Sequence, residues 1–247
     1  TVAFCTLGCK VNQYETDAMR GSFEAEGYEV KEFSQEASVY VINTCTVTNF
    51  GDKKSRQLIR KVKRQNENAI VAVVGCYAQT APKELMEIAG VNLVIGTKDR
   101  AQIVEMVEQY DRANGVENHV SDIMKERVFE PLSIQKLANR TRAYLKIQDG
   151  CSQYCSYCII PYARGPIRSR EPQEVVAEVK RLAKNGFKEV VLTGIHVASY
   201  GKDRRDTSLL DILKQVHEVE GIERIRFSSI EPNVVTEEFA QTMAALP

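Results

Sequence analysis

Short apolar runs alternate with amphipathic stretches along the first half of the chain, and this alternation limits the fold more than any other feature. Strands are expected where the runs are short and rich in β-branched residues: Val2–Leu7, Tyr28–Phe33, Val39–Asn43, Ile70–Val74 and Val91–Ile95. Helices are expected where the pattern is amphipathic: Thr16–Glu26, Lys53–Gln65, Pro82–Ala89 and Arg100–Tyr110. Because such alternation is typical of βαβ units, we expect residues 1–112 to form an α/β domain with a parallel, flavodoxin-like sheet.

A second α/β unit is expected over residues 141–247, after a linker at residues 113–140 that lacks a clean hydrophobic period. Its expected strands are Tyr144–Ile147, Glu189–Leu192 and Arg224–Ser228. Its expected helices are Gln173–Asn185, Leu209–Glu218 and one that begins near Thr236. These elements make about three βα repeats, whereas a closed barrel has about eight, so we expect the chain to end inside a partial (βα) barrel.

The composition is typical of a soluble globular protein, with 43% of the 247 residues hydrophobic and 27% charged. No apolar run approaches the roughly 20 residues needed to span a bilayer, and the first residues lack the basic and apolar regions of a secretory signal. We therefore expect a cytoplasmic protein with no membrane partner. The formal net charge is zero, so the overall charge gives no argument for nucleic-acid binding.

Three of the seven cysteines, Cys151, Cys155 and Cys158, lie in one loop after an expected strand. In a reducing compartment such cysteines are more often metal ligands than disulfides. Three soft thiolates suit an iron–sulfur cubane and leave one iron open to a substrate. A structural zinc site normally has four ligands, and the closest downstream histidine is His196, so zinc is the less favoured alternative.

A second set, Cys9, Cys45 and Cys76, is dispersed in sequence, but each member lies just beyond an expected strand. In a parallel sheet these positions converge on one edge, where ligands usually bind. Three thiolates there could hold a second metal cluster, and three separately buried cysteines are the alternative. Cys5 lies within the first expected strand and is expected in the core.

The loop run Cys151-Ser-Gln-Tyr-Cys155-Ser-Tyr-Cys158 resembles the CxxxCxxC signature of the radical S-adenosylmethionine (SAM) superfamily. The resemblance implies a 4Fe-4S cluster that binds SAM and cleaves it reductively to a 5′-deoxyadenosyl radical. Tyr157 is then expected near the adenine. Packing under the loop is the alternative for Tyr157. Four further residues are expected around the cofactor: Gly194, Ser229, Glu231 and Arg170. Gly194 could also be an ordinary turn glycine, Glu231 a solvated strand-end charge, and Arg170 a contact to substrate phosphate. No catalytic side chain is identified.

Five motifs together resemble the radical SAM methylthiotransferases: Thr6-Leu-Gly-Cys-Lys-Val-Asn12, Asn43-Thr-Cys-Thr-Val47, Lys54-Ser-Arg56, Gly75-Cys-Tyr-Ala-Gln79 and Cys158-Ile-Ile-Pro-Tyr-Ala-Arg-Gly-Pro-Ile-Arg-Ser-Arg170. This resemblance implies a second 4Fe-4S cluster on Cys9, Cys45 and Cys76. It also implies that the rest of the barrel and a TRAM domain are absent from this chain. The motifs around Cys9 and Cys76 are most similar to the branch that acts on threonylcarbamoyladenosine in tRNA.

The resemblance implies that a methylthio group is attached to C2 of that adenosine, next to the anticodon. A one-electron reductant such as flavodoxin or ferredoxin and a sulfur donor are the other expected partners. The alternatives are a methylthiotransferase for a ribosomal protein or isopentenyladenosine tRNA, and a non-catalytic iron–sulfur RNA-binding module.

Seven basic residues lie between positions 53 and 64, where a solvated helix face is the simplest interpretation. An RNA substrate gives them a further role, because phosphate contacts position a nucleic acid on a protein. The expected RNA-binding residues are Lys53, Lys54, Arg56, Arg60 and, after the cysteine loop, Arg164.

Overall fold

The computed structural model describes residues 1–46, 49–134 and 142–246, which form two compact units. The first unit contains residues 1–126 together with residues 132–134 and 153–165. The second contains residues 127–131, 142–152 and 166–246. The cysteine loop is therefore divided, with Cys151 in the second unit and Cys155 and Cys158 in the first.

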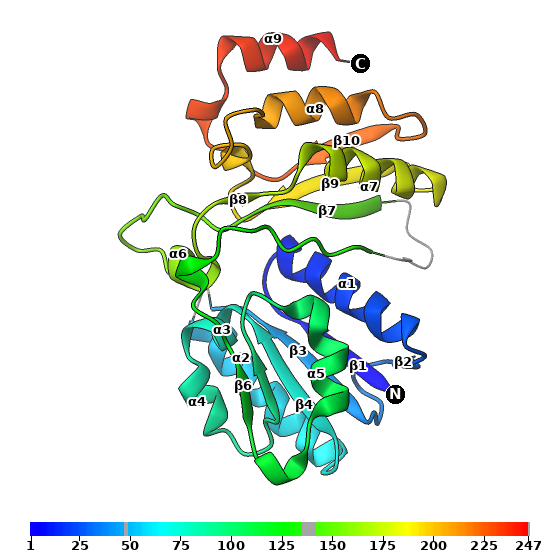
Figure 1. The fold of residues 1–247 in the computed structure, drawn as a ribbon, viewed down its shortest axis with the longest axis vertical. Helices are drawn as coiled ribbons and strands as arrows, with labels where there is room; N and C mark the ends of the chain where they lie inside the picture. The colour runs from blue at the N-terminus through cyan, green and yellow to red at the C-terminus, as the bar shows by residue number, and fades with distance from the viewer. Residues whose placement is uncertain (47–48, 135–141, 247) are drawn as a thin grey trace. The chain divides into compact units, whose positions relative to one another are not determined.

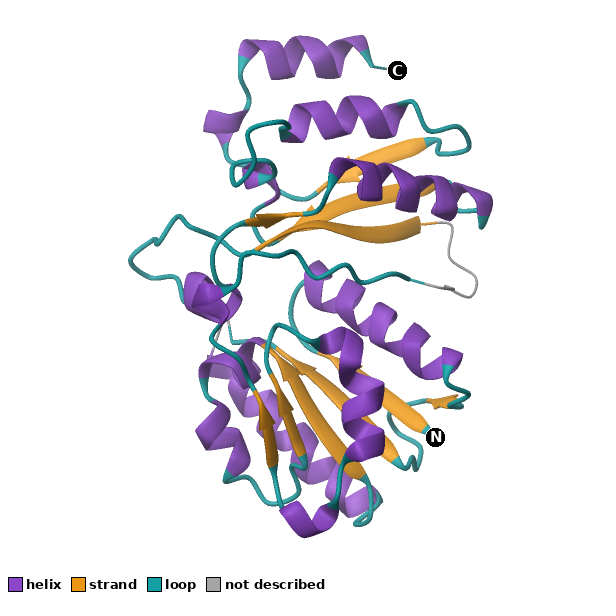
Figure 2. Ribbon diagram, viewed as in Figure 1, coloured by secondary structure: helices purple, strands orange, loops and turns teal. Residues whose placement is uncertain are grey.

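The first unit is built on a parallel sheet in the order β2-β1-β3-β4-β5-β6. Its strands are β1 (Val2–Thr6), β2 (Val30–Lys31), β3 (Val39–Thr44), β4 (Ile70–Gly75), β5 (Leu93–Ile95) and β6 (Glu117–His119). Its helices are α1 (Lys10–Ala25), α2 (Asn49–Gln65), α3 (Cys76–Thr80), α4 (Pro82–Met86), α5 (Ile103–Gln109) and α6 (Ile160–Arg164). Figure 1 shows this order by colour, and Figure 2 shows helices flanking the sheet. The parallel sheet predicted for residues 1–112 is confirmed.

Alternate residues of each strand enter two separate apolar cores, because side chains alternate across a strand. On one face Tyr40 and Ile42 pack with Ile59 of α2 and Leu85 of α4. On the other face Val39 and Val41 pack with residues of α1 and α5 such as Phe23 and Val107. Helices thus cover both faces of the sheet, so a ligand can approach the sheet at the ends of its strands.

The second unit has a four-stranded sheet in the order β10-β9-β7-β8. The strands β7 (Arg142–Asp149), β9 (Glu189–Gly194) and β10 (Arg224–Phe227) are parallel, and β8 (Arg168–Ser169) pairs antiparallel with β7. The helices are α7 (Pro172–Lys184), α8 (Leu209–His217) and α9 (Glu237–Ala245), with the Thr236 hydroxyl capping α9. Three parallel strands followed by helices confirm the predicted partial (βα) arrangement.

Four elements of the structure differ from the sequence-based expectation. Within the predicted linker, Glu117–His119 pairs with β5 as the sixth strand, which was not predicted. The short helices α3 and α6 and the two-residue strand β8 were not predicted, since four or five residues carry too little periodicity. Residues 135–140 of the expected linker, and Val47, lie outside the described residues. The part of the chain that the structure describes also contains five short 3₁₀ turns: Arg100–Gln102, Arg112–Asn114, Ile123–Lys125, Val197–Ser199 and Pro232–Val234.

Within the described residues, no helix combines the length and the apolar character needed to cross a membrane.

Candidate cofactor sites

The dispersed cysteines lie at one edge of the first sheet. Strands β1, β3 and β4 are neighbours and run parallel, so their C-terminal ends share that edge. Cys9 is the N-cap of α1, Cys45 directly follows β3, and Cys76 is the first residue of α3. The convergence that the strand-end positions predicted is therefore a feature of the structure, while the role of the three thiols as ligands stays a prediction.

Two glycines at this edge let the chain pass close to Cys45 and Asn43. Gly8 has a φ of +101°, and a Cβ there would lie 2.8 Å from both the Cβ and the Sγ of Cys45. Gly75 has a φ of +95°, and a Cβ there would lie 2.5 Å from Oδ1 of Asn43. Since L side chains rarely adopt this backbone conformation, both positions require glycine for the turn and for the close approach.

Asn12 holds the turns that carry Cys9 and Cys45. Its Nδ2 donates to the carbonyl oxygens of Leu7 at 2.7 Å and Thr44 at 2.9 Å. Its Oδ1 lies 3.7 Å from the Cys9 Sγ, which donates to it. One buried amide thus joins the ends of β1 and β3, which explains why the asparagine of the first motif follows Cys9 by one turn of helix.

Arg164 of α6 connects this network to Cys76. Its Nε lies 3.1 Å from the Cys76 Sγ, and its Nη2 donates to Oδ1 of Asn12 at 2.5 Å. Its Nη1 lies 2.5 Å from Oε1 of Glu15, whose Oε2 lies 2.5 Å from Nη1 of Arg100. Arg164 is 0% exposed, so the structure does not present it for the phosphate contact expected from the sequence.

Glu15, Arg100 and Asn12 were missed as site residues by the sequence reasoning. Glu15 carries a detectable signal, because it lies on the same helical face as the buried Val11 and Ala18. A carboxylate on an apolar face needs a buried cation. The cation cannot be named from the sequence, since Arg100 and Arg164 are distant from Glu15 along the chain.

The chemistry of the Cys76 thiol reflects two opposing effects. Burial raises the pKa of Cys76 to about 11, while the Arg164 guanidinium and its hydrogen bond act to lower it. Burial dominates because a thiolate loses its hydration in the interior. The free thiol is therefore protonated at neutral pH, and a metal would have to displace that proton on binding.

The donor set at this edge is three thiols, which is the ligand type that an iron–sulfur cluster takes. Within the described residues, no three His, Cys, Asp or Glu side chains are close enough together to hold one metal ion. A cluster distributes its cysteine ligands over several irons and so needs more widely spaced sulfurs than one zinc ion does. The Oδ1 of Asn43, which faces Gly75 at this edge, is buried and has no hydrogen-bond partner among the described residues.

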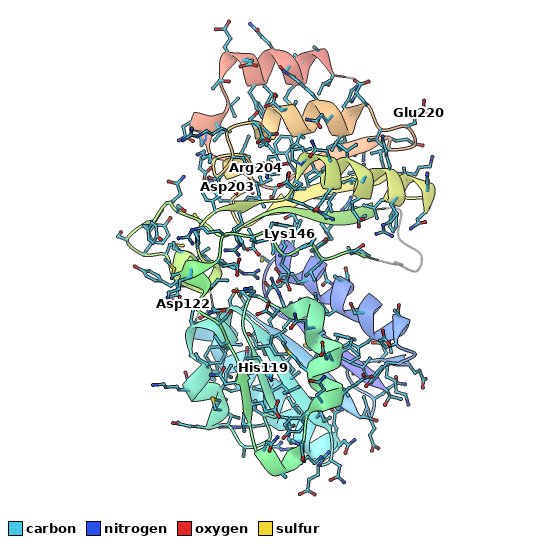
Figure 3. All side chains as sticks on the ribbon, viewed as in Figure 1. His119, Asp122, Lys146, Asp203, Arg204 and Glu220 are labelled. Atoms are coloured by element: carbon cyan, nitrogen blue, oxygen red, sulfur yellow. The ribbon has the colours of Figure 1, made fainter. Side chains whose placement is uncertain are left out.

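The loop cysteines have a different setting. In the second unit, Cys151 is buried and follows the end of β7. Buried Lys146 lies on β7 (Figure 3), and its Nζ is 3.0 Å from Oδ2 of Asp149, while Oδ1 of Asp149 accepts from the Gly150 amide at 2.8 Å. The Phe129 ring lies 5.3 Å from the same ammonium. The strand end before Cys151 is therefore fixed by a buried ion pair that the sequence reasoning also missed.

Cys155 and Cys158 lie in the first unit, where Cys155 is exposed and Cys158 half-buried. The Cys158 amide donates to the Cys155 carbonyl at 2.9 Å, which closes a tight turn between them. Tyr157, expected near the adenine, has a side chain that is 90% exposed. A side chain this exposed does not pack beneath the loop, which was the alternative role for Tyr157.

The other expected cofactor residues all lie in the second unit. A Cβ at Gly194 would lie 2.7 Å from Oε1 of Gln148, so local packing alone requires glycine there. Ser229 and Glu231 are exposed beyond β10, and Oε1 of Glu231 lies 2.6 Å from Nε2 of His196. Partial burial acts to raise the pKa of Glu231, but a backbone hydrogen bond and the His196 imidazole outweigh it and lower that pKa.

Arg170 provides the most direct sign of a ligand in this unit. It is 6% exposed, and its Nε and Nη1 have no hydrogen-bond partner among the described residues. The half-exposed Glu174 carboxylate lies 3.5 Å from Nε. Because buried guanidinium donors are costly to leave unpaired, this position suits an anionic ligand group.

The expected RNA-binding residues Lys53, Lys54 and Arg60 are exposed on α2. Arg56 is half-buried, with its Nη1 at 2.7 Å from both the Tyr77 hydroxyl and Oε1 of Glu84. The helix therefore offers exposed cationic side chains at three of the four positions, while Arg56 is bound to side chains of α3 and α4.

Two family models match the chain. Residues 1–96 match the uncharacterized protein family UPF0004, and residues 145–247 match the radical SAM superfamily. The chain is 52% identical, over 98% of its length, to the threonylcarbamoyladenosine tRNA methylthiotransferase MtaB of Bacillus subtilis, and 44% identical over 93% to that of Aquifex aeolicus. The chain belongs to the radical SAM methylthiotransferase family.

The chain spans about half the length of the curated relatives it matches, 54% and 56% of these two. A tRNA-2-methylthio-N(6)-dimethylallyladenosine synthase from Dictyoglomus thermophilum is 33% identical over 98% of the chain. Among solved structures, the radical SAM methyltransferase TsrM from Kitasatospora setae superposes with a TM-score of 0.63 at 19% identity, covering 99% of this chain and 57% of that one. At this identity the likeness concerns the fold, and it confirms the predicted combination of an α/β unit with a partial radical SAM unit.

Proposed function

We propose that this chain belongs to an enzyme that attaches a methylthio group to C2 of N6-threonylcarbamoyladenosine next to the anticodon of tRNA. The observation that carries the proposal is the 52% identity, over 98% of the chain, to a relative named for that activity. The synthase named for dimethylallyladenosine is only 33% identical, which favours the threonylcarbamoyl substrate over the isopentenyl one. The proposed compartment is the cytoplasm, where tRNA is modified.

The proposed reaction uses two three-cysteine sites, each with its own role. Cys151, Cys155 and Cys158 would hold one 4Fe-4S cluster, and Cys9, Cys45 and Cys76 a second. The first would supply the electron that cleaves SAM to a 5′-deoxyadenosyl radical, and the second would supply sulfur for transfer. A reductant such as flavodoxin or ferredoxin and a sulfur donor are the further partners that this chemistry requires.

The side chains of this chain then bind and orient the reactants. The buried N–H groups of Arg170 suit the carboxylate of SAM, and the exposed ring of Tyr157 is available to its adenine. Lys146 and Asp149 hold the strand end that precedes Cys151. The exposed Lys53, Lys54 and Arg60 would contact phosphates of the RNA and place its target base.

Anaerobic reconstitution of the full chain tests the two-cluster part of the proposal. We expect about eight irons and eight sulfides per chain, and release of 5′-deoxyadenosine when SAM and a reductant are added. One zinc per chain and no cleavage of SAM would support the non-catalytic module instead.

Mass spectrometry of tRNA nucleosides tests the substrate. Deletion of the gene is expected to remove the methylthio-threonylcarbamoyl nucleoside and to leave its precursor. If that nucleoside persists while a methylthiolated ribosomal protein disappears, the substrate assignment is contradicted.

A further inference from the structure

Arg164 combines complete burial with three specific contacts. Its Nε, Nη1 and Nη2 are directed at the Cys76 Sγ, Oε1 of Glu15 and Oδ1 of Asn12, at 3.1, 2.5 and 2.5 Å. The planar guanidinium fixes the direction of these donors relative to one another. Two charged or polar anchors therefore determine where the third donor, the Nε–H, points, and it points at sulfur.

Glu15 is itself held from the other side. Its Oε2 lies 2.5 Å from Nη1 of Arg100, and Nη2 of Arg100 donates to the Thr97 carbonyl at 2.5 Å. All three charged side chains are fully buried. Ion pairs on both sides of the carboxylate leave it little freedom to rotate away from Arg164.

The segment that contains Arg164 also carries two cysteines of the other set. Residues 153–165 belong to the first unit, and Arg164 follows Cys158 by six positions. The adjacent Ala163 carbonyl accepts a hydrogen bond from the Thr97 hydroxyl at 2.8 Å. One short stretch of chain is thus anchored next to Cys76 and covalently continuous with Cys155 and Cys158.

We propose that Arg164 is a positioning residue for both cysteine sets. It donates a hydrogen bond to the Cys76 sulfur when that sulfur is a cluster ligand, and it holds the segment bearing Cys155 and Cys158 on the sheet edge that bears Cys9, Cys45 and Cys76. The first part rests on the proposed function, since it needs a cluster at Cys76, whereas the second part does not. Hydrogen bonds to ligand sulfurs raise the reduction potential of a cluster and help to retain it.

The first test isolates the N-terminal cluster. The full chain with Cys151, Cys155 and Cys158 changed to alanine is reconstituted anaerobically, alone and with Arg164→Met or Arg164→Lys. We expect Arg164→Met to release iron to a chelator about ten- to a hundredfold faster, and to shift the midpoint potential to a more negative value. Arg164→Lys keeps the charge and should restore part of both properties.

Arg100→Met is the matched control. It removes the other buried guanidinium from Glu15 but leaves the hydrogen bond from Arg164 to Cys76 in place. In Arg164→Met the buried Glu15 carboxylate keeps Arg100 as its ion-pair partner, so the variant leaves no lone buried charge. If Arg164→Met and Arg100→Met give the same potential and the same iron release, the proposed role toward Cys76 is overturned while the two-cluster function stands. No iron in the parent variant would overturn both.

The second test needs no cluster. In the full chain with Cys9, Cys45 and Cys76 changed to alanine, limited proteolysis of the iron-free protein reports how firmly residues 153–165 are held. We expect Arg164→Met to expose new cleavage sites within that segment at a concentration of protease that leaves the parent intact. Equal protection of both proteins would overturn the proposed holding of the segment.

Discussion

The two cysteine sets of this chain differ in an instructive way. Cys151, Cys155 and Cys158 are compact in sequence, yet they are divided between the two units, with Cys151 buried and Cys155 exposed. Cys9, Cys45 and Cys76 are dispersed over 67 residues of sequence, yet they lie on one sheet edge within one unit. A local motif relies on its short loop to gather the ligands, whereas a dispersed set relies on the fold.

The residues that hold the two cysteine sets in place also differ. At the sheet edge, glycines, Asn12 and Arg164 approach the cysteines themselves. In the loop set, Lys146 and Asp149 hold the backbone before Cys151, and a backbone hydrogen bond closes the turn from Cys155 to Cys158. The sheet-edge cysteines are therefore approached by side chains, whereas these contacts of the loop set hold backbone.

Removing one cysteine from each set should separate the two roles. We expect Cys151→Ala and Cys45→Ala each to lower the iron content from about eight to about four per chain. Only Cys151→Ala should abolish reductive cleavage of SAM, and both should abolish the methylthio product. Cys5→Ala is the control, because Cys5 lies within β1 against the core and should leave both clusters intact. Loss of SAM cleavage in Cys45→Ala would contradict the division of roles.

Breaking the ion pair before Cys151 should destabilise the second unit strongly. Lys146→Met removes the ammonium at 3.0 Å from the buried Asp149 carboxylate and leaves Arg168 at 3.7 Å, so we expect a loss of unfolding free energy near the lower end of the about 3–5 kcal/mol for a broken buried pair. Urea unfolding of the iron-free protein measures this loss, and Lys146→Met/Asp149→Asn should recover most of it. The control is Lys188→Met, since the Lys188–Glu223 pair has the same 3.0 Å separation but is exposed, and should cost less than about 1 kcal/mol.

A methyl group at Gly8 should disturb the sheet-edge site directly. Gly8→Ala adds a Cβ at 2.8 Å from Cys45 and strains a φ of +101°, so we expect a loss of about 2–3 kcal/mol and a lower iron content at this site. Gly27→Ala is the matched control, because its φ is +81° but nothing lies within 4 Å, and it should cost about 1 kcal/mol with full iron. Equal iron content in both variants would show that the edge is less crowded than the structure indicates.

The sequence predicted the strands and the edge positions well because both depend on local patterns. Val39–Asn43 and Ile70–Val74 are continuous apolar runs, and the cysteines that follow them must share an edge if the sheet is parallel. The predicted start of α1 was six residues too late, because polar residues such as Asn12 and Glu15 lie on the buried face of its first turns. The amphipathic pattern therefore does not show there that the segment is helical.

The buried charge network could not be predicted from the sequence in the same way. Arg164 was expected to contact an RNA phosphate, because it follows the cysteine loop in a motif of the family, but it is 0% exposed. Its burial depends on Glu15 and Asn12, which are about 150 positions away, so only the fold brings the partners together. Gly194 shows the converse, because Gln148 gives a packing reason for this glycine that the sequence does not reveal, while its role toward the cofactor stays a prediction.

The basic helix α2 provides the smallest and most specific test, because it starts just beyond the sheet-edge cysteines. We expect Lys53→Ala and Lys54→Ala each to weaken tRNA binding a few-fold and to lower the slope of log affinity against log salt by about 0.7–0.9, as for one lost phosphate contact. Arg56→Ala should change the slope less, since Nη1 of Arg56 is already bound to Tyr77 and Glu84. Binding measured at several salt concentrations gives the slopes. If Arg56→Ala lowers the slope as much as the lysine variants do, Arg56 must leave Glu84 when RNA binds. The side chains of α2 would then rearrange on binding, unlike those packed around the sheet-edge cysteines.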